Sequence, residues 1–149
     1  MTAAHRELGA LRALLDGGQP MTAPIAAALG ADDELRALLR SADRENVQAA
    51  FAMAVINGHL EAVRLALEAG ADVNAYLIVH AHSTALHQAA NDNNVRLIEL
   101  LLAHGARRDL RDTLWSSTPL GWATYFDRRQ AMAALGRETS RGRAPSKRP

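Results

Sequence analysis

A segment of 34 to 35 residues recurs along the chain, and no other feature of the sequence constrains the fold as strongly. Gly70 and Gly105 are 35 residues apart, and the segments TALHQA and TPLGWA begin 34 residues apart, at Thr84 and Thr118. A weaker copy, APIAAALGADDELRALL, covers residues 23–39. A repeat of this length indicates an array of stacked supersecondary units.

Each copy of the segment predicts a helix, a turn, a second helix and a loop. Thr84 and Thr118 suit N-caps, because a hydroxyl oxygen can accept a free backbone N–H of the first helical turn. The turns between the paired helices hold residues that tolerate a left-handed backbone, namely Gly30, Gly58, Asn93 and Asp127. One helix pair cannot bury its own apolar face, whereas stacked neighbours can, so an elongated solenoid is predicted.

Four stretches of the sequence resemble the ankyrin repeat, and the chain as a whole resembles a small ankyrin-repeat protein of the bacterial type. They are TALHQAA, TPLGWA, NGHLEAVRLALEAGADVN (57–74) and ELLLAHGA (99–106). The resemblance is good over residues 48–136 and degenerate over 5–47, and near Ala49 the motif is too weak to fix the start of the helix. It implies an all-α solenoid of helix-turn-helix units with β-hairpin-like fingers. It also implies a concave face, made of fingers and first helices, that binds other proteins without catalysis.

The repeat pattern predicts one ankyrin-repeat domain over residues 1–136, followed by a basic tail. The expected units are a half unit (5–20), a degenerate repeat (21–45), two repeats (46–79 and 80–113) and a C-terminal repeat (114–136). Residues 137–149 hold five basic residues against Glu138, a charge of +4, whereas the whole chain carries +1 and its remainder therefore −3. Because this end is rich in Arg, Pro, Ser and Gly, we expect it to be disordered.

The predicted fingers are longer than the resemblance requires. Gly70 to Thr84 spans 14 residues and Gly105 to Thr118 spans 13, where about 12 is usual. Insertions in solenoids collect in such loops, and loops often carry binding specificity. The Thr-Pro-Leu-His motif is complete in neither copy, and Gly121 takes the place of its histidine in the second.

Three histidines lie close together in the segment HAHSTALH. His87 falls on the motif histidine, for which the resemblance implies a structural role: its ring hydrogen-bonds backbone groups and ties adjacent repeats together. His80 and His82 lie in the long finger, and on an extended strand they would point to the same side and could chelate a metal. A zinc site needs three or four ligands, and no cysteine or carboxylate lies near the pair, so a structural or partner-contacting role is favoured.

Two tryptophans are candidates for recognition. Trp122 takes the variable concave position of its first helix, and Trp115 lies in the finger before Thr118. Interface hot spots are enriched in such side chains, but each tryptophan is either an exposed anchor or part of the core between repeats. The predicted protein-binding residues are Tyr76, His80, His82, Gln88, Asn91, Trp115, Trp122 and Tyr125.

Several kinds of chemistry are missing from the sequence. The chain has no cysteine, which excludes disulfides and thiolate ligands, and it has neither a glycine-rich phosphate loop nor a nucleophile elbow. No apolar run approaches the ~18 residues of a membrane span. We therefore expect a protein that is not an enzyme, needs no cofactor or metal and acts in the cytoplasm.

The sequence leaves the partner open. The preferred prediction is a protein-binding module, with weak metal binding by His80 and His82 as one alternative. Nucleic-acid association through residues 137–149 is a second alternative, which the acidic body would oppose. No repeat follows the last helix, RQAMAALGRE, so a second copy of the chain could cover it and form a homodimer.

Overall fold

The computed structural model describes residues 9, 12–13, 16–18, 20–78 and 81–136 of the 149-residue chain. Within these residues the structure is formed by helices joined in pairs, which confirms the predicted all-α fold of helix-turn-helix units. The helices are α2 (Ala23–Leu29), α3 (Asp32–Leu39), α4 (Arg44–Asn57), α5 (Leu60–Glu68), α6 (Ala85–Asn91), α7 (Val95–Ala103), α8 (Pro119–Tyr125) and α9 (Arg129–Gly136). His80 and the predicted tail, residues 137–149, lie outside the described residues, and the predicted domain limits stay a prediction.

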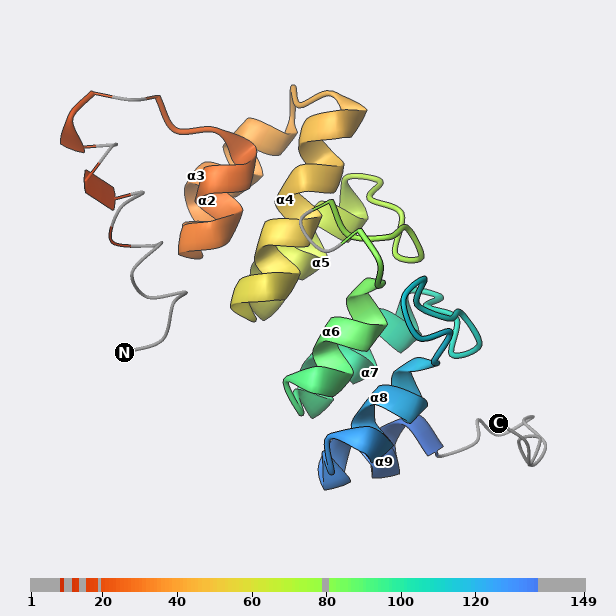
Figure 1. Cartoon of the computed structure of the whole chain (residues 1–149). Helices are drawn as coiled ribbons and strands as arrows, with labels where there is room; N and C mark the ends of the chain where they lie inside the picture. Colours follow the sequence, from red (N-terminus) through yellow and green to blue (C-terminus); the bar gives the residue numbers. More distant parts are fainter. Residues whose placement is uncertain (1–8, 10–11, 14–15, 19, 79–80, 137–149) are drawn as a thin grey trace.

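The helix pairs stack one after another along the long axis of the molecule (Figure 1). The first helices of the pairs, α2, α4, α6 and α8, form one layer, in which each helix contacts the next. The second helices, α3, α5, α7 and α9, form the layer behind, in which each helix again contacts the next one of the same layer. The predicted solenoid is therefore a two-layer stack in which each unit packs mainly against the units before and after it.

The core of the stack is built mainly from alanines and larger aliphatic side chains. The buried alanines of the first helices include Ala26, Ala54, Ala89 and Ala123, and their small size lets adjacent helices approach closely. The second helices bury larger groups, such as Leu97, Ile98 and Leu101 of α7. Both layers nevertheless bury small and large side chains, since α4 of the first layer buries Phe51 and α5 of the second buries Ala62.

The turns inside the helix pairs adopt the predicted left-handed backbone. The φ angles are 71° at Gly30, 69° at Gly58, 55° at Asn93 and 54° at Asp127. In each pair the N–H of the residue after the turn position donates to a carbonyl five residues earlier, as from Ala31 to Ala26. This bond satisfies a carbonyl at the helix end and sets the second helix back against the first.

Gly30 is the turn residue at which a side chain would cost most. A Cβ there would lie 3.0 Å from two ring atoms of His59, whose Nε2 lies 3.2 Å from the Ala28 carbonyl oxygen. We expect Gly30→Ala to lower the free energy of unfolding by about 1–3 kcal/mol, from backbone strain and displacement of the imidazole. Urea denaturation followed by circular dichroism measures this change. Gly136→Ala is the matched control, because its Cβ would meet nothing within 4 Å; an equal loss in both variants would contradict the expectation.

Helix α4 begins earlier than its counterparts and fixes the helix start that the sequence left open. Asp43 caps it by accepting a hydrogen bond from the Asn46 backbone N–H at 2.8 Å. The helix therefore has 14 residues, whereas α6 and α8 have seven each. Only residues 40–43 remain between α3 and α4, so about two added helical turns stand where later units have a finger.

Two fingers project from the same side of the stack (Figure 1). The first finger, residues 69–84, closes with an antiparallel bridge between Tyr76 and Thr84. The second finger, residues 104–118, is joined to the first by hydrogen bonds: Thr113 N–H to the His82 carbonyl at 2.9 Å, and Arg107 N–H to the Asn74 side-chain oxygen at 2.8 Å. The fingers therefore form one connected layer beside the helices.

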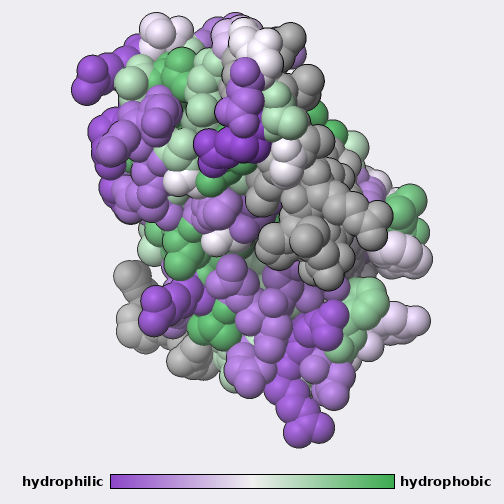
Figure 2. Space-filling view, turned by 90° about the vertical axis from the view of Figure 1, so that its left-hand side faces the viewer, coloured by the Kyte–Doolittle hydropathy of each residue, from purple (hydrophilic) through white to green (hydrophobic). Residues whose placement is uncertain are grey.

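The face shown in Figure 2 is largely hydrophilic, and its hydrophobic patches are separated from one another. The lower end, where α8 and α9 lie in Figure 1, is covered mostly by hydrophilic residues in that view. None of the helices in the described part of the chain combines the length and the apolar character needed to cross a membrane.

Candidate functional site

The carboxylate of Asp112 organises the junction between the second finger and α8. The residue is 2% exposed. One carboxylate oxygen accepts the backbone N–H groups of Leu114 at 2.9 Å and Trp115 at 2.6 Å. The other accepts the Ser117 backbone N–H and the Trp122 indole N–H, both at 2.9 Å. One buried side chain thus shapes the finger and fastens it to the helix.

The hydrogen bonds at Asp112 favour its charged form. Burial alone raises the pKa of this carboxyl, because the charged form loses hydration. The bonds from Trp115, Trp122, Ser117 and Leu114 outweigh burial and lower the pKa from 3.8 to about 2. At neutral pH the junction therefore contains a fixed negative charge that is fully occupied by donors.

His87 ties α6 to the second finger, as the resemblance implied. The fully buried ring places Nε2 2.8 Å from the Ser117 carbonyl oxygen and Nδ1 3.2 Å from the Thr84 backbone nitrogen. A carbonyl can only accept, so Nε2 carries the proton and Nδ1 accepts from Thr84. This arrangement requires a neutral imidazole and confirms the structural role of His87.

The protonation of His87 gives a pH-dependent stability. Burial lowers its pKa below 6.5, outweighing the bond to Ser117 and the nearby Asp112 charge, which both raise it. The neutral ring is thus favoured in the folded state, and its contribution to stability is complete above pH 6.5 and declines as the pH falls through this value. We expect the urea midpoint to fall from pH 7.5 to pH 5.5, and the fall to shrink in His87→Gln. His104→Gln, at an exposed histidine, should keep the full decline; a decline unchanged in His87→Gln would contradict the assignment.

The two tryptophans occupy different environments above this junction. Trp122 is 9% exposed, and its ring centroid lies 5.0 Å from that of His87. Of the two roles that the sequence left open, an exposed anchor or part of the core, Trp122 has the second. Trp115 is 66% exposed, and its ring centroid is 6.0 Å from those of His82 and Trp122. Trp122 therefore forms the base on which the other two rings stand.

The aromatic rings continue along the end of α8. Phe126 lies 6.5 Å from Trp122 and 5.0 Å from Tyr125, in edge-to-face arrangements. Tyr125 is 84% exposed. We use the name aromatic surface for His82, Trp115, Tyr125 and Phe126, with Trp122 at its base. It spans the first finger, the second finger and α8.

The other predicted binding residues contribute less directly. The Tyr76 hydroxyl donates to the Arg111 carbonyl at 2.8 Å, which joins the two fingers. Gln88 is half-buried and donates its side-chain amide to Asp92, and the half-buried Asn91 accepts from Arg128 through its backbone carbonyl. The structure thus brings His82, Trp115, Trp122 and Tyr125 into one ring cluster, while His80 lies outside the described residues.

Phe126 is the aromatic residue that sequence reasoning missed. It sits directly before the left-handed turn residue Asp127, where the equivalent positions hold Asn57 and Asp92. A phenylalanine at a position that holds a polar residue in the two preceding units is the signal that could have identified it. Leu114 in the second finger and Ile78 in the first are also exposed.

No group of three or more histidine and acidic side chains with metal-binding geometry is found among the described residues. His82 instead contacts two tryptophan rings. Among the described residues, therefore, the arrangement at His82 presents aromatic surface rather than a ligand cluster.

Comparison with known proteins finds two parts of the chain that match ankyrin repeats. The Ankyrin repeat family model matches residues 46–76 and 82–113. A fowlpox virus (strain NVSL) protein that is named as an ankyrin repeat protein is 40% identical over 62 residues, which is 42% of this chain and 9% of the relative. The chain thus spans less than a tenth of this viral relative, and the match gives no support to the bacterial type that the sequence suggested.

Proposed function

We propose that this chain, which contains ankyrin repeats, binds a protein partner through its aromatic surface and has no catalytic role. Ankyrin repeats are generally protein–protein interaction modules. The observation that carries the proposal is the exposure of Trp115 and Tyr125 on a base of buried, hydrogen-bonded side chains. We propose the cytoplasm as the place of action.

The buried side chains beneath the aromatic surface hold the exposed ring of Trp115 in a fixed position, which favours binding. Trp115 is held by its backbone bond to Asp112 and by ring contacts to His82 and Trp122. A binding group that is ordered before the partner arrives loses less conformational entropy on association. Tryptophan and tyrosine are also the side chains most enriched at the energetic centres of interfaces.

Affinity capture from a lysate with quantitative mass spectrometry tests the proposal. We expect a partner to be retained by the native chain and reduced at least about tenfold by Trp115→Ala or Tyr125→Ala, the loss typical of a hot-spot residue. Arg96→Ala, at an exposed position on α7 in the other layer, is the matched control and should retain it. If the two aromatic variants stay folded and capture the same proteins as Arg96→Ala, the aromatic surface is not the interface.

We also propose a homodimer in which a second copy of the chain contacts α9. Helix α9 buries Ala131, Ala134 and Leu135 against the stack, and Met132 is half-buried. Light scattering coupled to size-exclusion chromatography distinguishes a monomer from a dimer. Met132→Glu is expected to dissociate a dimer that uses this helix, because it places a charge in the contact.

A further inference from the structure

We infer that the aromatic surface takes an acidic peptide segment with an apolar anchor side chain, a specificity that rests on the proposed protein-binding function. The anchor would contact the exposed rings of Trp115 and Tyr125. The acidic groups would contact the guanidinium groups of Arg111 and Arg128, which border these rings. The charges of the described residues around the rings carry this inference.

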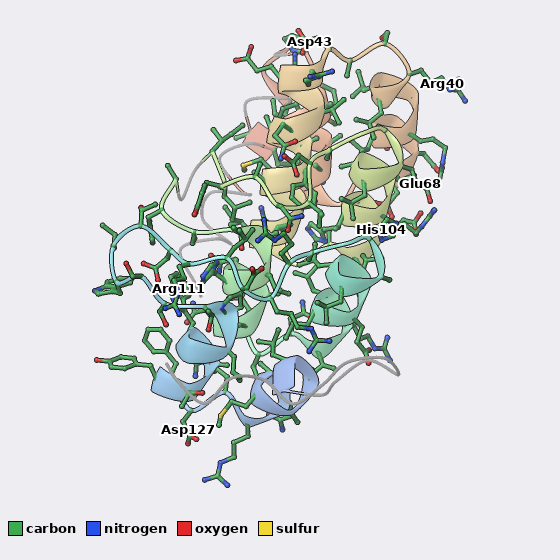
Figure 3. All side chains as sticks on the ribbon, turned by 90° about the vertical axis from the view of Figure 1, so that its right-hand side faces the viewer. Arg40, Asp43, Glu68, His104, Arg111 and Asp127 are labelled. Atoms are coloured by element: carbon green, nitrogen blue, oxygen red, sulfur yellow. The ribbon has the colours of Figure 1, made fainter. Side chains whose placement is uncertain are left out.

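Arg111 stands where the two fingers meet. Its backbone carbonyl accepts the Tyr76 hydroxyl, and its exposed side chain donates from Nη1 to the Ser116 carbonyl at 2.6 Å. Figure 3 shows Arg111 on the side of the fingers and α8, away from Glu68 and His104 at the ends of α5 and α7. The bond to Ser116 holds the guanidinium beside the segment that carries Trp115.

Arg128 borders the other end of the aromatic surface. Its Nε donates to the Asn91 carbonyl at 2.7 Å, and its guanidinium carbon lies 5.8 Å from the centre of the Phe126 ring. The Asn91 carbonyl and the Phe126 ring are both uncharged. Within the described part of the chain, neither Arg111 nor Arg128 forms an ion pair with a carboxylate.

The acidic groups nearest in sequence have hydrogen-bond or ion-pair partners other than Arg111 and Arg128. The oxygens of Asp112 are buried and occupied by four donors. Asp127 pairs with Arg129 at 3.4 Å, and Asp92 accepts the Gln88 amide at 3.1 Å. Both guanidinium groups at the rim of the aromatic surface therefore have no carboxylate partner among the described residues, which favours an acidic partner over a basic one.

The chemistry of the partner follows from the two kinds of group at this surface. A guanidinium presents a planar fork of N–H donors that matches a carboxylate. Exposed aromatic side chains bury a large apolar area when an apolar side chain packs on them. A segment with one large apolar residue flanked by aspartate or glutamate satisfies both requirements, and charge attraction would also speed its association.

Selection from a random peptide library displayed on phage, with the full chain as the target, tests the inference. We expect the recovered peptides to carry acidic residues on both sides of a leucine or an aromatic residue. Their affinities, measured by fluorescence anisotropy, should fall about 30-fold in Trp115→Ala and about twofold to fivefold in Arg111→Gln. Raising the salt concentration should shrink the Arg111→Gln effect.

Two further variants separate charge from structure. Arg111→Lys keeps the charge without the planar fork and should recover most of the affinity lost in Arg111→Gln, even if the bond to Ser116 is broken. Arg96→Gln removes the same charge from an exposed position on α7 and should leave the affinity unchanged. Thermal unfolding of every variant shows whether the fold persists.

The outcomes distinguish this inference from the proposed function. Peptides that depend on Trp115 but are neutral or basic, or that bind Arg111→Gln as tightly as the native chain, would overturn the acidic specificity and leave the protein-binding function standing. A selection with no Trp115-dependent peptide would also overturn the specificity. The protein-binding function itself fails only if lysate capture is the same in the aromatic variants and Arg96→Ala.

Discussion

Asp112→Ala is expected to lower the free energy of unfolding by about 3–5 kcal/mol, the usual cost of removing one partner from a buried charged network. The variant leaves four donors without their acceptor: the backbone N–H groups of Leu114, Trp115 and Ser117, and the indole N–H of Trp122. The indole N–H is buried, so it cannot donate a hydrogen bond to water unless the ring moves. We expect the second finger to lose its fixed shape as well.

Urea denaturation at neutral pH measures this loss, and Asp109→Ala is its matched control. Asp109 lies three positions earlier in the same finger, but it is exposed and pairs with the exposed Arg107. Its removal should leave the midpoint nearly unchanged, because exposed ion pairs contribute little. Similar midpoints for the two variants would show that Asp112 does not hold the finger.

The pH dependence of stability provides a second readout for Asp112. Its pKa is about 2 in the folded state and 3.8 as the ordinary value, so its contribution is complete above 3.8 and disappears as the pH falls toward 2. The native chain should lose stability over this window. Asp112→Ala should lose less of it over the same window, because the variant has no carboxyl to protonate there.

Trp122→Ala is expected to cost about 3–5 kcal/mol, the range for truncating a buried aromatic side chain. The indole fills the space between His87, His82, Trp115 and Phe126, and it donates to Asp112. Its loss leaves a cavity and removes one of the four donors that stabilise the Asp112 carboxylate. Urea denaturation again gives the measurement.

Trp115→Ala and Trp122→Phe separate the parts of this effect. Trp115 is the same residue type in the same cluster but is largely exposed, so its removal should cost about 1 kcal/mol or less. Trp122→Phe keeps a ring and loses the N–H, and about 1.5–3 kcal/mol is expected for a hydrogen bond to a charged group. If Trp115→Ala destabilised the chain as much as Trp122→Ala, the division into base and exposed ring would be incorrect.

The parts of the fold that depend on local chemistry could be predicted from the sequence. The turn residues Gly30, Gly58 and Asn93 adopt positive φ because glycine and asparagine tolerate it. Thr118 caps α8 by accepting the Gly121 N–H at 3.1 Å. Each of these outcomes rests on a residue and its neighbours within one turn, so repetition of the pattern was enough.

The parts of the candidate site that depend on contacts across the chain could not be predicted. The sequence gives no reason to expect one of Trp115 and Trp122 to be more exposed than the other. In the fold, Asp112 accepts the indole N–H of Trp122, ten positions later, and so holds that ring in the core. The border formed by Arg111 likewise depends on the folded finger, in which Ser116 returns to meet its guanidinium. The start of α4 depended on Asp43, which no repeat pattern marked.

The bond between His87 and Ser117 couples the last helix pair to the rest of the stack. In a stack of nearest-neighbour units, cooperativity depends on such junctions, and a junction weakened by acid lets the end unit fray first. The aromatic surface crosses this same junction, with His82 on one side and Tyr125 on the other. A partner bound there would act as a clamp, so its binding and the folding of the C-terminal unit would be thermodynamically linked.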